Sequence, residues 1–341
     1  MKKTIIAAAI ATVIAAPAMA DVSVSGVVEQ AFASVDTTAT DATTTAPAIN
    51  TATANAADQG WQSQPDNSIT FKASEDLGNG MTAFAQITLD TDASAAPKDE
   101  KVGVKGGFGT VVLGRMEDFS EGVMAATMTF NGPAGIELAG ATGRNNGAVA
   151  YVSPTINGVH AGIAGYTGTG AGDTDTFDAV DMIIAYDNGP LSAKISHEIL
   201  NGSVVSPAVT AVAAVLDTAT AQGTSEVTAI PEGSDQETTS ISVKYAMGDL
   251  SAAVLHVSQD NAGGVAGADA DDLMLRLDYK MGNNKITLGH AQNETSGAAD
   301  VDVTALELTH SMSKRTSVYV GMSDSDTDTA DNTYVGMIHK F

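Results

Sequence analysis

The chain has 341 residues and no cysteine, which excludes disulfide bonds, thiol catalysis and thiolate metal sites. Its 16 Lys and Arg residues stand against 41 Asp and Glu residues, giving a net charge of −25. Because nucleic-acid phosphates are bound mainly by Lys and Arg, this acidic excess argues against a nucleic-acid partner and favours cations near the protein surface.

The N-terminal segment carries the pattern of an export signal. Two lysines follow Met1, residues 4–17 are apolar and Ala-rich, and Ala18-Met19-Ala20 has the small-x-small form of a cleavage site. We therefore predict a signal peptide over residues 1–20 with cleavage between Ala20 and Asp21; a buried N-terminal helix is the alternative. Beyond this segment, no apolar run of the sequence is long enough for a membrane-spanning helix.

Alternating apolar and polar residues predict β-strands along the rest of the chain. In residues 273–280 (LMLRLDYK), every odd residue is apolar or aromatic and three of the four even ones are charged, which separates them onto opposite faces of a strand. Sixteen such runs are predicted, at residues 22–34, 66–75, 81–90, 100–105, 109–114, 144–153, 159–166, 178–187, 191–199, 238–247, 250–258, 271–280, 285–293, 302–311, 316–323 and 332–341.

The connections between these runs alternate in length. The short ones have at most five residues and are rich in Gly, Asn, Asp and Pro, as hairpin turns require, whereas the long ones have at least eight residues. This alternation is typical of an outer-membrane barrel with short periplasmic turns and long external loops. We therefore predict an all-β fold, a transmembrane antiparallel up-and-down β-barrel of 16 strands that forms a single unit over residues 21–341. In the long connection 200–237, the apolar run 208–216 could be a helix, a rim loop or a further hairpin, which would give 18 strands.

The two ends of the chain are expected to pair with each other. In hydrocarbon every backbone polar group needs an internal partner, so the last strand must close the sheet on residues 22–32. Phe341 then ends a paired strand, with its ring at the lipid–water boundary. Four further aromatic residues near short turns predict a periplasmic girdle: Tyr151, Tyr186, Tyr245 and Tyr279.

Four stretches of the sequence resemble the Gram-negative trimeric porin family. They are NSITFKASEDLGNGMTAFAQITL (67–89), KVGVKGGFGTVVLGR (101–115), NNGAVAYVSPTINGVHAG (145–162) and YVGMIHKF (334–341). The resemblance implies a sixteen-stranded general-diffusion channel in the outer membrane that assembles as a homotrimer and passes small hydrophilic solutes and ions. It also implies contact with outer-membrane lipids and lipopolysaccharide, and recognition of Phe341 by the barrel-assembly machinery. The chain departs from the family at Ser68 and Ile338, where Arg is frequent.

The resemblance further implies that the third external loop, residues 115–143, folds into the lumen and narrows it, with acidic groups facing basic ones. The residues expected at this constriction are Arg115, Glu117, Asp118, Glu121, Glu137 and Arg144. Lys72 is a further basic candidate for the lumen wall, and Arg276 is another because of its place in the alternation of residues 273–280. With the acidic excess, we expect the pore to prefer cations. The alternative is that the acids of the loop are ordinary solvated external charges.

A passive pore needs a polar wall and a field but no catalytic residue, so we expect no cofactor and no resident metal. The Asp-rich loops lack the spacing of a calcium-binding loop, although loose bridging to anionic lipid by divalent cations stays open. Two other classes of protein are kept as alternatives. One is a lipase-like outer-membrane enzyme, against which the lack of a G-x-S-x-G stretch argues, and the other is a secreted β-rich adhesin.

Overall fold

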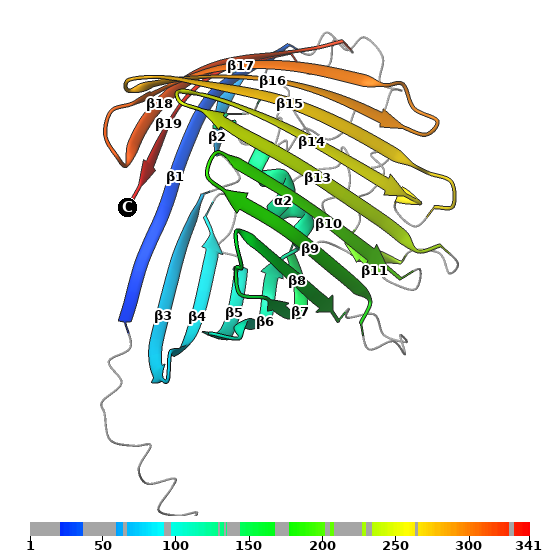
Figure 1. Cartoon of the computed structure of the whole chain (residues 1–341). Coiled ribbons are helices and arrows are strands. Elements are labelled where there is room, and N and C mark those ends of the chain that lie inside the picture. The colour runs from blue at the N-terminus through cyan, green and yellow to red at the C-terminus, as the bar shows by residue number, and fades with distance from the viewer. Residues whose placement is uncertain are drawn as a thin grey trace, which may run out of the picture.

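The computed structural model describes residues 21–36, 59–63, 67–91, 97–128, 130–132, 134, 144–167, 177–201, 205–207, 227–229, 234–262, 265–326 and 331–341. In this part of the chain, sixteen strands form one closed antiparallel sheet, as predicted (Figure 1). They are β1 (Asp21–Asp36), β3 (Ser68–Gly78), β4 (Met81–Asp90), β5 (Pro97–Gly106), β6 (Gly109–Glu117), β7 (Arg144–Val152), β8 (Val159–Tyr166), β9 (Ala179–Asn188), β10 (Leu191–Leu200), β13 (Gln236–Met247), β14 (Leu250–Asp260), β15 (Ala270–Met281), β16 (Asn284–Thr295), β17 (Val301–Ser311), β18 (Thr316–Ser325) and β19 (Asp331–Lys340). The predicted signal peptide and Glu137 lie outside the described residues.

The first strand closes the barrel because it has neighbours along both of its edges. β1 pairs with β19 from Val27 to Asp36, while its first half pairs with β3 and its second half with the short strand β2 (Gln59–Ser63). Asn67 lies between β2 and β3 and accepts a hydrogen bond from the Glu29 N–H through its side-chain carbonyl. Its amide donates in return to the Glu29 carbonyl at 2.9 Å. The side chain therefore replaces backbone hydrogen bonds where the neighbouring strand is interrupted.

The C-terminal residue is paired beyond the end of β19. The Gly26 N–H donates to the Phe341 carbonyl at 3.0 Å and the Phe341 N–H donates to the Gly26 carbonyl at 3.1 Å. The aromatic ring lies across Gly26, where a Cβ atom would stand 2.4 Å from the Phe341 Cζ. The predicted pairing of the chain ends is thus present, and it needs a residue without a side chain at position 26.

The two faces of the sheet differ in polarity. On β15, Leu275 is 50% exposed, whereas its neighbour Arg276 is only 8% exposed, and this alternation runs along the strand. The outward face carries the exposed apolar side chains, which suits a lipid environment. Tyr151, Tyr245, Tyr279 and Phe341 lie on this exposed surface near the short turns or the chain end.

The barrel has sixteen strands and not eighteen. In the connection between β10 and β13, the described residues include two short strands, β11 (Val205–Pro207) and β12 (Val227–Ala229). These two pair with each other in a separate sheet. Residues 208–216 lie outside the described residues.

One helix, α2 (Phe119–Met128), lies inside the curve of the sheet (Figure 1). It packs on the inner faces of β9, β10 and β13–β15. Val123 and Met124 of the helix form a buried cluster with Leu255, Val257 and Met274 of the wall. No helix among the described residues has the length and hydropathy needed to cross a bilayer.

Candidate functional site

The segment after β6 enters the barrel as a capped helix. Asp118 occupies the N-cap of α2 and its carboxylate accepts a hydrogen bond from the Glu121 N–H at 2.5 Å. The residues D-F-S-E thus form the acidic form of a capping pattern, in which a side chain satisfies a free N–H of the first turn. Asp118, which the sequence predicts at the constriction, is 2% exposed in the structure and caps the start of the helix.

A buried carboxylate of the wall holds the same end of the helix. Asp181, on β9, is fully buried and accepts a hydrogen bond from the Phe119 N–H at 2.5 Å. Free N–H groups and the positive end of the helix dipole both favour an anion at this point. On the neighbouring strand β10, Ser196 contacts Ser120 with 3.1 Å between the two hydroxyl oxygens. The start of α2 is therefore fixed to β9 and β10.

The tip of the segment is fixed to the other side of the wall. Glu307, on β17, is fully buried and accepts hydrogen bonds from the Asn131 N–H at 2.9 Å and from the Gly132 N–H at 3.3 Å. The Asn131 amide and the Thr309 and Tyr334 hydroxyls also donate to this carboxylate. Five donors on one carboxylate make a strong, charge-assisted attachment. Buried carboxylates of the wall therefore hold the segment at its start and at its tip.

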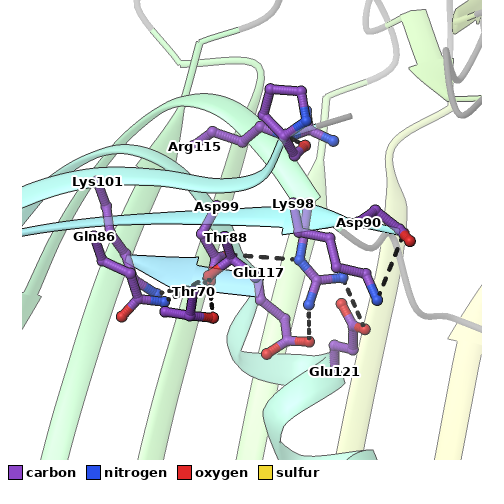
Figure 2. A network of polar contacts seen from close by, with 12 residues as sticks. Thr70, Gln86, Thr88, Asp90, Lys98, Asp99, Lys101, Arg115, Glu117 and Glu121 are labelled. Atoms are coloured by element: carbon purple, nitrogen blue, oxygen red, sulfur yellow. Dashed lines mark hydrogen bonds and ion pairs between the residues drawn. The ribbon is translucent and has the colours of Figure 1, made fainter. Parts of the chain in front are cut away.

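At the root of the segment, one guanidinium lies among three carboxylates. Arg144 is the direct cross-strand neighbour of Glu117, and its Nη2 lies 3.1 Å from the Glu117 Oε1. Its Nε is 3.5 Å from Asp99 Oδ1 and its Nη1 is 3.7 Å from Glu121 Oε1. Asp99 also accepts from Gln86 and from Lys101, at 3.0 and 3.4 Å. We name the group Asp90, Lys98, Asp99, Lys101, Glu117, Glu121 and Arg144 the root cluster (Figure 2).

The proton affinity of Glu121 is unusual. The pKa of Glu121 is raised from 4.5 to about 8, first by burial and then by the hydrogen bond and negative charge of Glu117, whereas Arg144 opposes the rise. A carboxyl in this position is neutral at pH 7 and becomes charged as the pH rises through about 8. The root cluster therefore has four acidic and three basic groups, but one of the acids is protonated near neutral pH.

The sequence predicted acidic groups of the loop opposite basic groups of the wall, and the structure brings Glu117, Glu121 and Arg144 of this set together. Arg144 and Glu117 lie side by side on adjacent strands, because β6 and β7 pair directly across this end of the barrel. Arg115 does not join the root cluster: its Nε donates to the Pro97 carbonyl at 3.2 Å, and its side chain points to the other side of the strands (Figure 2). Its cross-strand neighbour is Glu100.

The two predicted residues of the lumen wall lie apart from the root cluster. Lys72 is exposed and shares its cross-strand row with Gln86, whose amide reaches Asp99, so Lys72 is on the inward face of β3. Arg276 is also on the inward face, where its guanidinium donates twice to Asp278, at 3.0 and 2.9 Å. It lies 5.5 Å from the ring centre of Phe130, near the tip of the inner segment.

Three residues that the sequence analysis did not single out are central to this arrangement. Asp99, Asp181 and Glu307 are inward-facing acids in alternating strands, where they look like ordinary polar residues of a wet wall. Their partners are 62 residues away for Asp181 and 176 for Glu307, so local pattern carries little of the signal. For Asp181 and Glu307 the available signal was an acidic residue among inward-facing positions of the strand that are otherwise small or neutral.

Comparisons with known proteins place this geometry in context. The model of a family described as Gram-negative porin matches residues 7–330. The major outer membrane protein P.IB of Neisseria meningitidis serogroup B is 35% identical over 122 residues, which is 34% of each chain, so the chain spans about a third of that relative's length. Among solved structures, the anion-selective porin from Comamonas acidovorans covers 94% of this chain and 100% of its own, with TM-score 0.68 and 18% identity. In-vitro folded OmpT of Vibrio cholerae in its trimer form (TM-score 0.64, 13% identity, 94% and 99% covered) and Salmonella typhi OmpF in complex with daunomycin (0.65, 14%, 94% and 97%) share the fold.

Proposed function

Since the chain belongs to the Gram-negative porin family and is an outer-membrane porin, we propose that its lumen is a water-filled path for passive diffusion of small hydrophilic solutes and ions, with a preference for cations. The observation that carries this proposal is the inner segment. Asp181 holds the start of α2, and Glu307 holds the tip of the segment at Asn131. The segment therefore narrows the lumen without being rigid by itself. The root cluster supplies the charged groups beside which a solute passes.

The preference for cations rests on the balance of charges. The three basic groups of the root cluster face three acids, Asp90, Asp99 and Glu117, and a fourth acid, Glu121, which is protonated at neutral pH. The cation preference then comes from the acidic outer mouth of a chain with net charge −25, and the root cluster adds to it at alkaline pH. The selectivity named for the Comamonas acidovorans porin does not decide this point, because at 18% identity the two chains share only the fold.

Reconstitution in a planar bilayer tests the proposal. A reversal potential measured across a gradient of KCl should have the sign of a cation-preferring pore, and a clear anion preference would refute that part of it. Liposome swelling with sugars of graded size tests separately whether the path is open and how wide it is. Swelling that is no faster than in empty liposomes, even with the smallest sugar, would refute the diffusion pore.

Further parts of the proposal concern assembly and export. We include a homotrimer, which the trimer form named for Vibrio cholerae OmpT supports, in contact with outer-membrane lipids and lipopolysaccharide. Recognition of Phe341 by the barrel-assembly machinery and removal of residues 1–20 complete it. Cross-linking of the purified protein checks the homotrimer. Mass spectrometry of the mature chain checks the removal of residues 1–20, and we expect the mature chain to start at Asp21.

The pore is also proposed to act without catalysis. A diffusion path is made by the wall and its field, and it requires no nucleophile or general base. The competing class is a lipase-like barrel enzyme. Purified protein that produces conductance steps and fails to hydrolyse phospholipid supports the pore, and turnover that persists in purified preparations supports the enzyme.

A further inference from the structure

Four basic side chains gather on the inner wall far along the sheet from the root cluster. They are Lys244 on β13, Arg276 and Lys280 on β15, and Lys285 on β16. Together they line a hollow of about 290 Å³ next to the short turns that join β13 to β14 and β15 to β16. Since short turns face the periplasm in this type of barrel, the hollow opens at the periplasmic mouth. We name these four residues the basic patch.

The hollow exists because the residues between these side chains are small. Ala246, Gly248 and Ser251 belong to its lining and fill little of the space beneath the long basic side chains. The hollow has room for a small, compact ion and its remaining hydration, and too little for a large apolar ligand.

The lining of the hollow carries more positive than negative charge, with four basic side chains against Asp249 and Asp278. The Arg276 guanidinium is neutralised by its paired hydrogen bonds with Asp278, whose carboxylate also accepts from the Thr287 hydroxyl at 2.8 Å. The ammonium groups of Lys244, Lys280 and Lys285 have no ion pair within the part of the chain that the structure describes.

Two of these lysines are placed against each other. Lys280 and Lys285 are direct cross-strand neighbours, and like charges in that position destabilise a sheet. A mobile anion between the lysines removes the repulsion.

We propose that the basic patch is a binding site for small polyanions that carry two or more closely spaced phosphate or carboxylate groups. Lysine ammonium groups are compact, strongly hydrated charges that suit such groups without demanding one fixed geometry. Asp249, on the turn beside the patch, adds a negative charge to the lining of the hollow. Because this charge repels anions, the site favours ligands that carry several negative charges over singly charged ones. The site gives the periplasmic mouth a selectivity opposite to that of the acidic outer mouth.

The test is an equilibrium titration of the full-length barrel purified in detergent, with pyrophosphate and with citrate as separate probes and chloride held constant. We expect saturable binding with one site per chain, and the tighter of the two probes identifies phosphate or carboxylate as the preferred group. The double variant Lys280→Gln with Lys285→Gln should weaken binding at least about tenfold, since two charged contacts are lost. Heat-modifiable migration on a gel confirms that the variant barrel is folded.

The matched control removes the same charge from other parts of the inner wall. Lys105 lies at the periplasmic end of β5 in the same inward-facing row as Lys101, and Lys72 faces inward on β3. The double variant Lys72→Gln with Lys105→Gln should change the affinity by less than about twofold, because distant charges are screened. Lack of saturable binding by either probe, or equal weakening in both double variants, would overturn the site. Because the titration does not depend on conduction, a failed site and a failed diffusion pore give separate results.

Discussion

Replacement of Glu121 by Gln should abolish a rise of cation selectivity at alkaline pH. In the wild-type protein the pKa of Glu121 is raised to about 8, chiefly by burial, so the carboxyl is neutral below that pH and negative above it. The root cluster then gains one negative charge between pH 7 and pH 9 without any change of fold. In Glu121→Gln the side chain keeps its shape and stays neutral throughout.

The size of the effect follows from Coulomb's law. A monovalent cation that passes about 5 Å from the ionised carboxylate gains about 0.8 kcal/mol in a medium with the dielectric constant of water. About half of this survives screening at physiological salt, because the Debye length is about 8 Å. A gain of about 0.4 kcal/mol is about a twofold change in local cation concentration, with an opposite twofold change for anions, so the permeability ratio should rise about fourfold.

Reversal potentials in a KCl gradient at pH 6.5, 7.5, 8.5 and 9.5 measure this ratio. Glu75→Gln is the matched control, because it removes a carboxylate from an exposed position near the β3–β4 turn, away from the root cluster. The control should follow the wild-type curve and Glu121→Gln should be flat. A wild-type ratio that does not change across this range, or a rise that persists in Glu121→Gln, would show that Glu121 does not titrate beside the conducting path.

Two other variants test the attachments of the chain. Glu307→Gln weakens the charge-assisted hydrogen bonds that hold Asn131. We expect the free energy of unfolding to fall by about 1–3 kcal/mol and single-channel currents to become noisier. Quiet, unchanged currents would contradict this attachment. Gly26→Ala places a methyl group 2.4 Å from the Phe341 ring and should reduce the heat-modifiable, folded fraction on gels, with a cost of about 1–3 kcal/mol. Gly107→Ala, which meets no neighbouring atom within 4 Å, should leave that fraction unchanged, and an equal loss in both variants would remove the argument for ring contact.

The strands could be predicted because their signal is local. The alternation over residues 273–280 depends on the pleat of one strand, and β15 shows it from Ala270 to Tyr279. The turns were equally local: Gly78, Asn79 and Gly80 all adopt positive φ, which their residue types allow. Closure followed from the requirement that no strand edge is left open in lipid.

Alternation could not predict on which face of the sheet the residues near loop 115–143 lie. Strict alternation puts Arg115 and Glu117 on one face of β6, but the structure sends them to opposite sides of the sheet (Figure 2). The register shifts between Gly114 and Met116, at a bulge where Gly114 has φ 128°. Bulges redirect side chains, and a glycine in the sequence does not reveal by itself whether one is present.

The described wall carries acids at its outer end and a local group of basic side chains at its inner end, and this difference decides what net charge means for transport. Exposed acids such as Asp260, Asp271 and Glu294 lie at the ends of strands next to long loops, whereas the basic patch lies beside short turns. The apolar band of such barrels is about 25 Å tall, so the two ends are separated by several Debye lengths of about 8 Å and act independently. A net charge of −25 therefore governs encounter at the outer mouth, while the lysines govern what is retained at the inner one. A cation is drawn in at the outer mouth, and an anion that passes this mouth meets a favourable site at the inner one, so the proposed preference for cations requires that the outer part of the path limits the flux.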